Sequence, residues 1–284
     1  MTATGSEHEA ARAATATEIP DAPPWEGLSV ASAKLGAPLP PEHLDRLLRY
    51  RDLLIEWNAR FNLTALHQPD AIEQRLILDA LRLLPAIDVV VADASEVVSL
   101  VDVGSGGGFP GLPIAICRPK VQVRLMEATG KKVGFLNEAI RDLGLGNARA
   151  VHGRAEDLGH DLDYRGQFDI ATARAVASLP ALIELTMPLL RLGGSAFFPK
   201  GTNLAEELRE SAAACRALGA VIVGDEVLPG GETRLISVHK RDATPDRYPR
   251  RAGIPAREPI GAAAPGRTGR DTHARRRAGT DDRP

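Results

Sequence analysis

The chain has 284 residues, of which 44% are hydrophobic and 4% aromatic, with a formal net charge of −2. The length allows one large domain or two small ones. Cys117 and Cys215 fit no C-x-x-C spacing, which excludes a disulfide framework and a cysteine zinc site. No apolar run reaches the roughly 20 residues of a membrane helix. We therefore expect a cytoplasmic protein without metal and without contact to a membrane.

Positive charge gathers at the end of the chain. Residues 240–284 contain twelve Lys or Arg and six Asp or Glu, so the rest carries about −8 by difference. Such a stretch is typical either of a nucleic-acid contact or of a disordered end, and composition leaves both open. We assign residues 1–24 and 261–284 to disordered tails and residues 241–260 to a basic segment.

Two helices are expected before the first strand, in an N-terminal helical segment over residues 25–96 that packs on the core. Residues 41–60 have an apolar stripe with charges opposite, as in an amphipathic helix. Asp70 and Glu73 have capping-box spacing and open a second helix that ends at Pro85. Residues 87–96 have no clear period, and their form stays open.

Strands and helices alternate over residues 97–240, which we assign to one domain. The expected strands are residues 97–103, 121–126, 148–152, 168–173, 195–199, 221–228 and 234–239. The expected helices are residues 111–117, 130–143, 203–218 and a helix capped by Ser178 that runs to Leu192 and ends at Gly193-Gly194. The last two strands should form an antiparallel hairpin. The fold class is α/β, a doubly wound Rossmann-like sheet, mostly parallel with one antiparallel edge strand.

The first strand runs into four glycines within five positions, Gly104, Gly106, Gly107 and Gly108. Glycine permits positive φ and lets a ligand approach where a Cβ would collide. Phe109 stands where the third glycine of a dinucleotide fingerprint belongs, so the loop fits NAD poorly. Asp-x-Gly-x-Gly-x-Gly looks instead like the loop that binds S-adenosylmethionine (SAM). The alternative is a turn that only links strand to helix.

Further cofactor contacts are expected at the carboxyl ends of the strands, where ligands of open parallel sheets bind. Glu127 ends the second strand, at a distance from the loop that suits a ribose-binding carboxylate. Ala155 and Glu156 follow the third strand and could flank adenine, although Glu156 could equally be an acid of a helix N-terminus. Arg174 ends the fourth strand and could orient the cofactor or an RNA anion, or form a structural salt bridge.

No general base or nucleophile is evident. An Asn- or Asp-Pro-Pro-aromatic motif is absent after the fourth strand, and both cysteines fall on expected helices. A ring nitrogen such as guanine N7 offers a lone pair and loses no proton on methylation. The sequence therefore fits an enzyme that acts by positioning alone, with no catalytic residue in the acid–base sense.

These residues resemble the bacterial small-subunit ribosomal RNA methyltransferase G family, also called glucose-inhibited division protein B. The resemblance covers residues 50–259. Its motifs are residues 61–64, 102–111, 130–132 with 135–136, 153–156, 174–175, 200–201 and 248–255. It implies methyl transfer from SAM to N7 of a guanine in 16S rRNA, with the 30S subunit as partner; we expect a monomer.

Site residues follow from the same motifs. Those that match the family's SAM contacts are Gly104, Phe109, Ala155, Glu156 and Arg174, to which the loop and spacing arguments add Gly106 and Glu127. The residues expected on the RNA side are Asn62, Lys131, Arg154 and Lys200, with Arg250 and Arg251 from the basic segment. Leu76 and Ala80 stand where the family usually has His and Ser, a change that is either neutral or alters RNA affinity. The alternative function is a non-catalytic RNA-binding or ribosome-assembly protein on the same fold.

Overall fold

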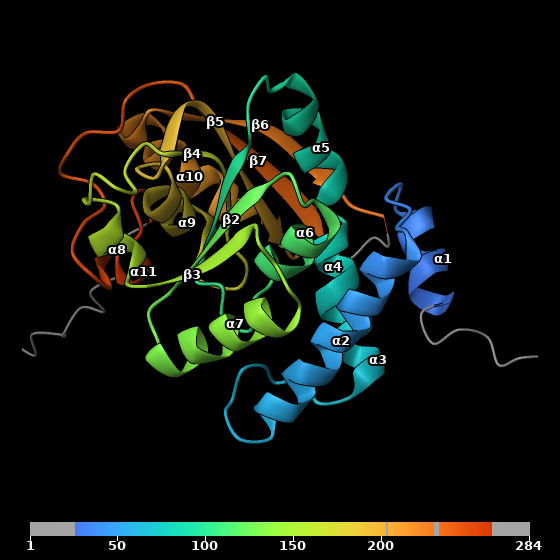
Figure 1. Ribbon diagram of the computed structural model, residues 1–284. Coiled ribbons are helices and arrows are strands. Elements are labelled where there is room, and N and C mark those ends of the chain that lie inside the picture. Colours follow the sequence, from blue (N-terminus) through green and yellow to red (C-terminus); the bar gives the residue numbers. More distant parts are fainter. Residues whose placement is uncertain (1–25, 203, 230–232, 263–284) are drawn as a thin grey trace, which may run out of the picture.

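A seven-stranded sheet in the order β3-β2-β1-β4-β5-β7-β6 forms the centre of the molecule (Figure 1). The structure is a computed structural model that describes residues 26–202, 204–229 and 233–262. The expected tails at residues 1–24 and 261–284 lie outside the described residues, apart from Gly261 and Ala262. The strands are β1 (Ser99–Val103), β2 (Gln122–Glu127), β3 (Ala148–His152), β4 (Phe168–Thr172), β5 (Leu190–Lys200), β6 (Ala220–Val227) and β7 (Arg234–Lys240).

The sheet is mostly parallel, as the sequence predicts. Strands β1 to β5 run the same way, and β7 is antiparallel to both β5 and the outermost strand β6. The expected hairpin between the last two strands is therefore confirmed. Since β1 lies between β2 and β4, the strand order reverses beside β1. In open α/β sheets this is the point at which ligands bind, beyond the carboxyl ends of the strands.

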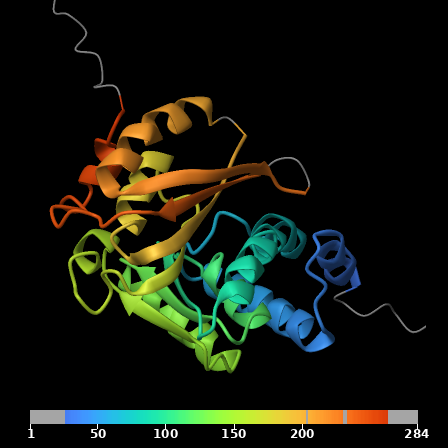
Figure 2. The same cartoon turned by 90° about the horizontal axis from the view of Figure 1, so that it is seen from above.

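Helices cover both faces of the sheet (Figures 1 and 2). The helices before β1 join α6 and α7 in one apolar cluster on the first face, whereas α9 and α10 form a second cluster on the other face. The helices are α1 (Glu26–Lys34), α2 (Pro41–Asn58), α3 (Pro69–Ile72), η1 (Glu73–Ile77), α4 (Leu78–Leu81), α5 (Leu84–Asp93), α6 (Gly111–Cys117), α7 (Gly130–Asp142), α8 (Ala155–Leu158), α9 (Leu179–Thr186), α10 (Ala205–Leu218) and α11 (Ile254–Arg257).

The second expected helix is broken into three parts, and its capping box is wrong. The π-helix η1 lies between α3 and α4, and α3 is preceded by Gln68 without a side-chain cap. The carboxylate of Glu73 instead pairs with the guanidinium of Arg51 on α2. Pro85 does not end a helix either. It lies in the first turn of α5, where the missing N–H has no cost. Of residues 87–96, whose form the sequence left open, residues 87–93 are therefore helical and residues 94–96 are not.

The helix that begins after Ser178 is shorter than expected. It ends at Thr186 rather than Leu192, and the side chain of Ser178 makes no cap bond. Pro188 cannot donate the hydrogen bond that would continue the helix. Gly193 and Gly194 therefore lie within β5, beside an irregularity in its pairing with β4.

After β7 the chain returns across the second face to α11 and Ala262. The guanidinium of Arg165 holds this return segment by donating to the carbonyls of Tyr248 and Thr244 at 2.8 and 2.9 Å. It also donates to the Gly159 carbonyl at the end of α8, at 2.7 Å. Among the described residues, no helix is both long and apolar enough to cross a membrane, and no cluster of metal-ligating side chains is present.

Candidate cofactor and RNA site

The loop of residues 104–109 joins β1 to α6 at the carboxyl edge of the sheet. Gly104, Gly106 and Gly108 have φ angles of +71°, +57° and +94°. The N–H groups of Gly104 and Ser105 donate to the Met126 carbonyl at 2.9 and 3.0 Å, which ties the loop to β2. The Gly108 and Phe109 N–H groups turn back to the Ser105 carbonyl. The loop is thus closed on itself and fixed to the sheet.

The glycines serve different purposes. A Cβ at Gly108 would lie 2.4 Å from Leu112 Cδ1 and 2.8 Å from Tyr50 Oη, and one at Gly104 would lie 2.7 Å from Val176 Cγ2. At Gly106 the nearest atom would be the Gly104 carbonyl oxygen, at 3.8 Å. Two glycines thus allow protein packing, whereas Gly106 faces open space. The loop therefore leaves room for a ligand at Gly106.

Asp102 supports the loop from inside. Its side chain is fully buried. Oδ2 accepts the Gly111 N–H at 3.1 Å, and Oδ1 accepts the Thr172 hydroxyl at 3.2 Å. Burial raises the pKa of this carboxyl to about 6, partly opposed by these hydrogen bonds. Asp102 therefore links β1, β4 and the start of α6, and has no surface for a ligand.

Glu127 connects the glycine loop to the loop after β2. One carboxylate oxygen accepts the Gly106 N–H at 3.0 Å, and the other accepts the Thr129 N–H at 2.8 Å. Each oxygen of a carboxylate has two acceptor sites, so capacity remains for two hydroxyl donors. The ribose of SAM carries such a pair of hydroxyls. Glu127 thus suits the role that the sequence predicts for it.

The third expected contact has a different arrangement. Ala155 and Glu156 open α8 directly after Arg154, where the first N–H groups of a helix have no intrahelical partner. The carboxylate of Glu156 accepts the Gly253 N–H at 2.7 Å and so holds the segment after β7. The structure therefore leaves the backbone of Ala155 and Glu156, rather than the Glu156 side chain, to face a ligand.

Arg174 combines the two alternatives that the sequence left open. Its guanidinium lies 3.2 Å from the Asp79 carboxylate and donates to the Arg75 carbonyl at 2.5 Å, which makes a structural salt bridge. Its Nη1 is buried and has no hydrogen-bond partner among the described residues. The Nη1 NH₂ group thus has donor capacity that no described residue uses, which suits an anionic group of the cofactor or of RNA.

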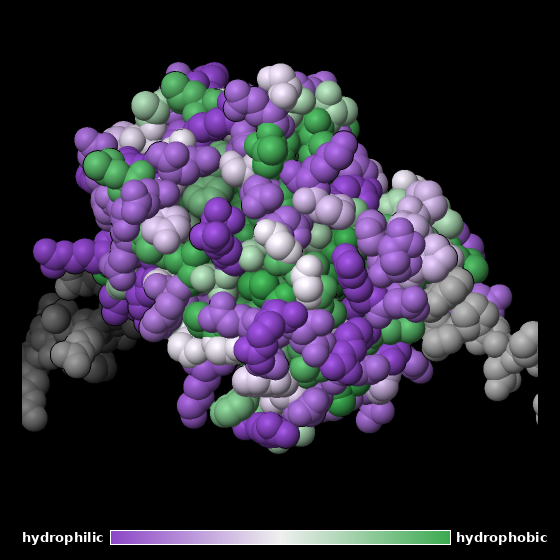
Figure 3. Space-filling model, viewed as in Figure 1, coloured by the Kyte–Doolittle hydropathy of each residue, from purple (hydrophilic) through white to green (hydrophobic). Residues whose placement is uncertain are grey.

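Three of the residues expected on the RNA side are exposed at this edge of the sheet. They are Asn62, Lys131 and Arg154. The ammonium of Lys131 lies 5.5 Å from the centre of the Phe61 ring, so the loop after α2 and the start of α7 are neighbours. Hydrophilic residues cover the part of the surface where α7 and the end of α2 lie (Figure 3). Lys131 and Arg154 place two positive charges at this edge, which can contact a polyanion.

Two other expected RNA contacts are occupied by protein partners. The Lys200 ammonium lies 2.8 Å from the Glu207 carboxylate and donates to the Ala177 carbonyl. The Arg250 guanidinium binds both oxygens of the fully buried Glu184 at 2.7–3.1 Å. The structure therefore gives Lys200 and Arg250 a structural role. Arg251 is exposed.

Sequence reasoning missed the residues that hold these groups in place. Tyr50 donates its hydroxyl to the Gly107 carbonyl. Asn58 accepts the Leu63 and Thr64 N–H groups at 2.8 and 3.0 Å and so shapes the loop that carries Asn62. Tyr50 lies in the apolar stripe of α2, where the pattern indicates only core. Asn58 is a polar residue just before the motif at residues 61–64, and this position could have indicated that its side chain shapes the loop. The structure shows that the side chain is buried.

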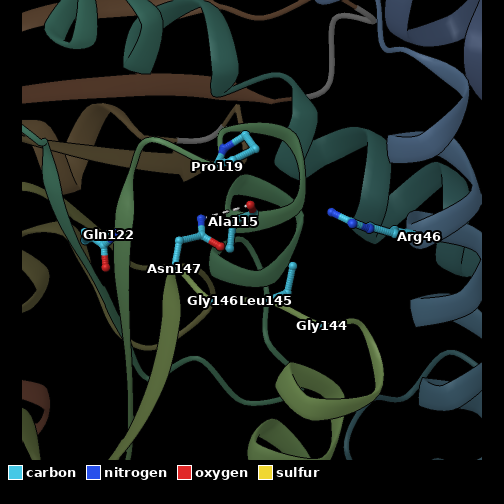
Figure 4. A pocket seen from close by; sticks show the side chains of 8 residues that line it. All are labelled: Arg46, Ala115, Pro119, Gln122, Gly144, Leu145, Gly146 and Asn147. Carbon is cyan, nitrogen blue, oxygen red and sulfur yellow. Dashed lines mark hydrogen bonds between the residues drawn. The ribbon is translucent and has the colours of Figure 1, made fainter.

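Two of the cavities in the described part of the chain lie away from this edge. One of about 280 Å³ lies at the amino ends of the strands, between Arg46, Gln122 and Asn147 (Figure 4). The other, of about 580 Å³, is an apolar groove between α5 and strands β5 to β7. Neither includes residues of the glycine loop, Glu127 or Arg174.

The chain is similar to known proteins along most of its length. Residues 43–228 match the family model GidB, described as rRNA small subunit methyltransferase G. The ribosomal RNA small subunit methyltransferase G of Chloroflexus aggregans is 43% identical over 79% of this chain and 93% of its own. That of Streptococcus thermophilus is 39% identical over 83% and 99%. The crystal structure of an rRNA methylase from Streptococcus thermophilus is 17% identical over 56% of this chain and 95% of its own, with a TM-score of 0.41.

Proposed function

Because this chain belongs to the rRNA small subunit methyltransferase G family, we propose that it transfers a methyl group from SAM to N7 of a guanine in 16S rRNA. The chain is a SAM-dependent rRNA methyltransferase. We place its substrate in the 30S subunit or in free 16S rRNA, and its site of action in the cytoplasm. We also propose that it acts as a monomer.

The observation that carries the proposal is the arrangement at the carboxyl edge of the sheet. Gly106 faces open space, Glu127 has spare acceptor capacity, and Arg174 Nη1 is a buried donor without a partner. SAM has a methionine part with a carboxylate, and a ribose with two hydroxyls. These three groups offer the kinds of contact that the parts of SAM require, which supports the proposal.

When bound, SAM supplies a methyl group on a positively charged sulfur. The loop at Gly106 allows the backbone to approach the methionine part closely. Glu127 accepts hydrogen bonds from the ribose hydroxyls, and Arg174 Nη1 donates to an anionic group. On the other side, Lys131 and Arg154 hold RNA phosphates through charge.

No residue needs to remove a proton, because guanine N7 has a free lone pair in the plane of its ring. The chain contributes by holding the nitrogen, the methyl carbon and the sulfur in line. Positioning of this kind can contribute roughly 7–11 kcal/mol to lowering a barrier. The buried Asp102 is not a candidate base, since it has no exposed surface.

The test is incubation of the protein with labelled SAM and one of three substrates: assembled 30S subunits, protein-free 16S rRNA or transfer RNA. We expect label on N7 of a single guanine in 16S rRNA, in one or both of the first two. Label in transfer RNA alone would contradict the proposal. No label together with no heat of SAM binding would favour a non-catalytic RNA-binding protein.

A further inference from the structure

Helix α2 reaches the glycine loop through a single buried tyrosine. The Tyr50 side chain is fully buried, and its hydroxyl donates to the carbonyl of Gly107, which is itself buried. The Tyr50 ring lies 5.1 Å from the ring of Phe109, centre to centre. Burial raises the pKa of Tyr50 well above its usual value, so the hydroxyl stays protonated and remains a donor.

Three consecutive loop residues are in contact with this helix. Leu54 Cδ1 would lie 3.2 Å from a Cβ at Gly107, and Tyr50 Oη would lie 2.8 Å from one at Gly108. Phe109 packs on the Tyr50 ring. Gly107 and Gly108 therefore lack side chains at the positions where α2 approaches. The absence of a side chain at Gly107 and Gly108 makes room for α2, whereas its absence at Gly106 makes room for the ligand.

The other fixed points of the loop come from the sheet. Met126 and Glu127 at the end of β2 accept the N–H groups of Gly104, Ser105 and Gly106. The Gly107 carbonyl is the loop group that is held by the N-terminal helices. The Ser105–Gly106 peptide is thus held by β2, and the Gly107–Gly108 peptide, one residue further on, is held by α2.

We propose that Tyr50 is a positioning residue for the cofactor: its hydroxyl fixes the Gly107 carbonyl and thereby holds Gly106 in the orientation that receives SAM. This inference rests on the proposed function. Without the hydroxyl, the Gly107 carbonyl is buried without a donor, and the loop relaxes to satisfy it. The cofactor then has to restore the loop when it binds, which weakens its affinity.

Tyr50→Phe tests this, with Tyr164→Phe as the matched control. The Tyr164 hydroxyl makes no hydrogen bond within the described residues, and its ring packs on the other face of the sheet. By calorimetry, we expect the Kd for SAM to rise about fivefold in Tyr50→Phe, as for the loss of one hydrogen bond, and to stay within twofold of wild type in Tyr164→Phe. The KM for SAM should rise equally, while kcat at saturating SAM stays within twofold.

A second measurement distinguishes a local change in the glycine loop from a general loss of stability in Tyr50→Phe. In hydrogen exchange, we expect the Gly108 and Phe109 amides of folded Tyr50→Phe to exchange faster than in wild type, with the sheet unchanged. An unchanged Kd for SAM, or unchanged exchange in the loop, would overturn the inference while leaving the proposed function intact. Absence of SAM binding by the wild-type chain would overturn both.

Discussion

The glycine loop at residues 104–109 and the return segment at residues 241–262 both carry residues that the sequence predicts for the site, but they use these residues differently. The loop offers backbone groups and open space at Gly106, which its own sequence determines. The return segment offers charged side chains, but the guanidinium of Arg250 in this segment is paired with the Glu184 carboxylate. A backbone cradle can therefore be recognised locally, whereas the availability of a charge depends on partners far away in the chain.

The largest effect should come from Arg250→Ala. It removes the guanidinium and leaves the fully buried Glu184 carboxylate with only the backbone N–H of residue 250 as a partner among the described residues. Breaking a buried pair in this way costs about 3–5 kcal/mol, which urea denaturation measures directly. Arg251→Ala, one residue further on and exposed, should change the free energy of unfolding by less than about 0.5 kcal/mol. Equal changes in the free energy of unfolding for Arg250→Ala and Arg251→Ala would contradict a structural role for Arg250.

The loop has its own buried charge, and its signature is a dependence on pH. The pKa of Asp102 is raised to about 6 in the folded state, above its value of about 3.9 in unfolded chains. The protonated form favours folding, so its contribution is full below pH 4 and is lost as pH rises through 6. Asp102→Asn does not titrate. Its free energy of unfolding should therefore gain about 2 kcal/mol relative to wild type between pH 4 and 7; a constant difference would contradict a raised pKa.

Glu127→Gln tests the carboxylate of the loop against that of the return segment. The amide has one carbonyl oxygen, so either the Gly106 or the Thr129 N–H faces an NH₂ group. We expect the Kd for SAM to rise roughly tenfold in calorimetry. Glu156→Gln should leave it within twofold, because the Glu156 carboxylate binds Gly253. A larger loss of SAM affinity in Glu156→Gln than in Glu127→Gln would show that the Glu156 side chain contacts the cofactor.

An effect of similar size is expected on the RNA side. Arg154 is exposed at the carboxyl edge of the sheet, and its loss removes about one phosphate contact. Arg154→Ala should lower kcat/KM for the RNA substrate by about tenfold at low salt, with less effect at high salt. The Kd for SAM should not change. Equal losses in both quantities would place Arg154 on the cofactor side.

Local sequence patterns were sufficient to predict the sheet, since buried strands appear as apolar runs and the turns between them contain glycines. Local patterns failed where the role of a residue depends on a partner far away in the chain. Glu73 looked like a helix cap but pairs with Arg51, and Pro188 ended α9 before the glycines that seemed to end it. Likewise the sequence predicts the loop but not Tyr50, because a tyrosine in an apolar stripe has the pattern of core whether or not its hydroxyl holds a distant carbonyl.

The central claim is that the open face at Gly106 receives SAM. Calorimetry with SAM on wild type and Gly106→Val, with circular dichroism on both, tests it most directly. Valine would place a branched side chain in the open space at a φ of +57°. We predict one SAM bound by wild type and no measurable binding by a folded Gly106→Val. Wild-type affinity in the variant would contradict the claim and remove the loop from the cofactor site.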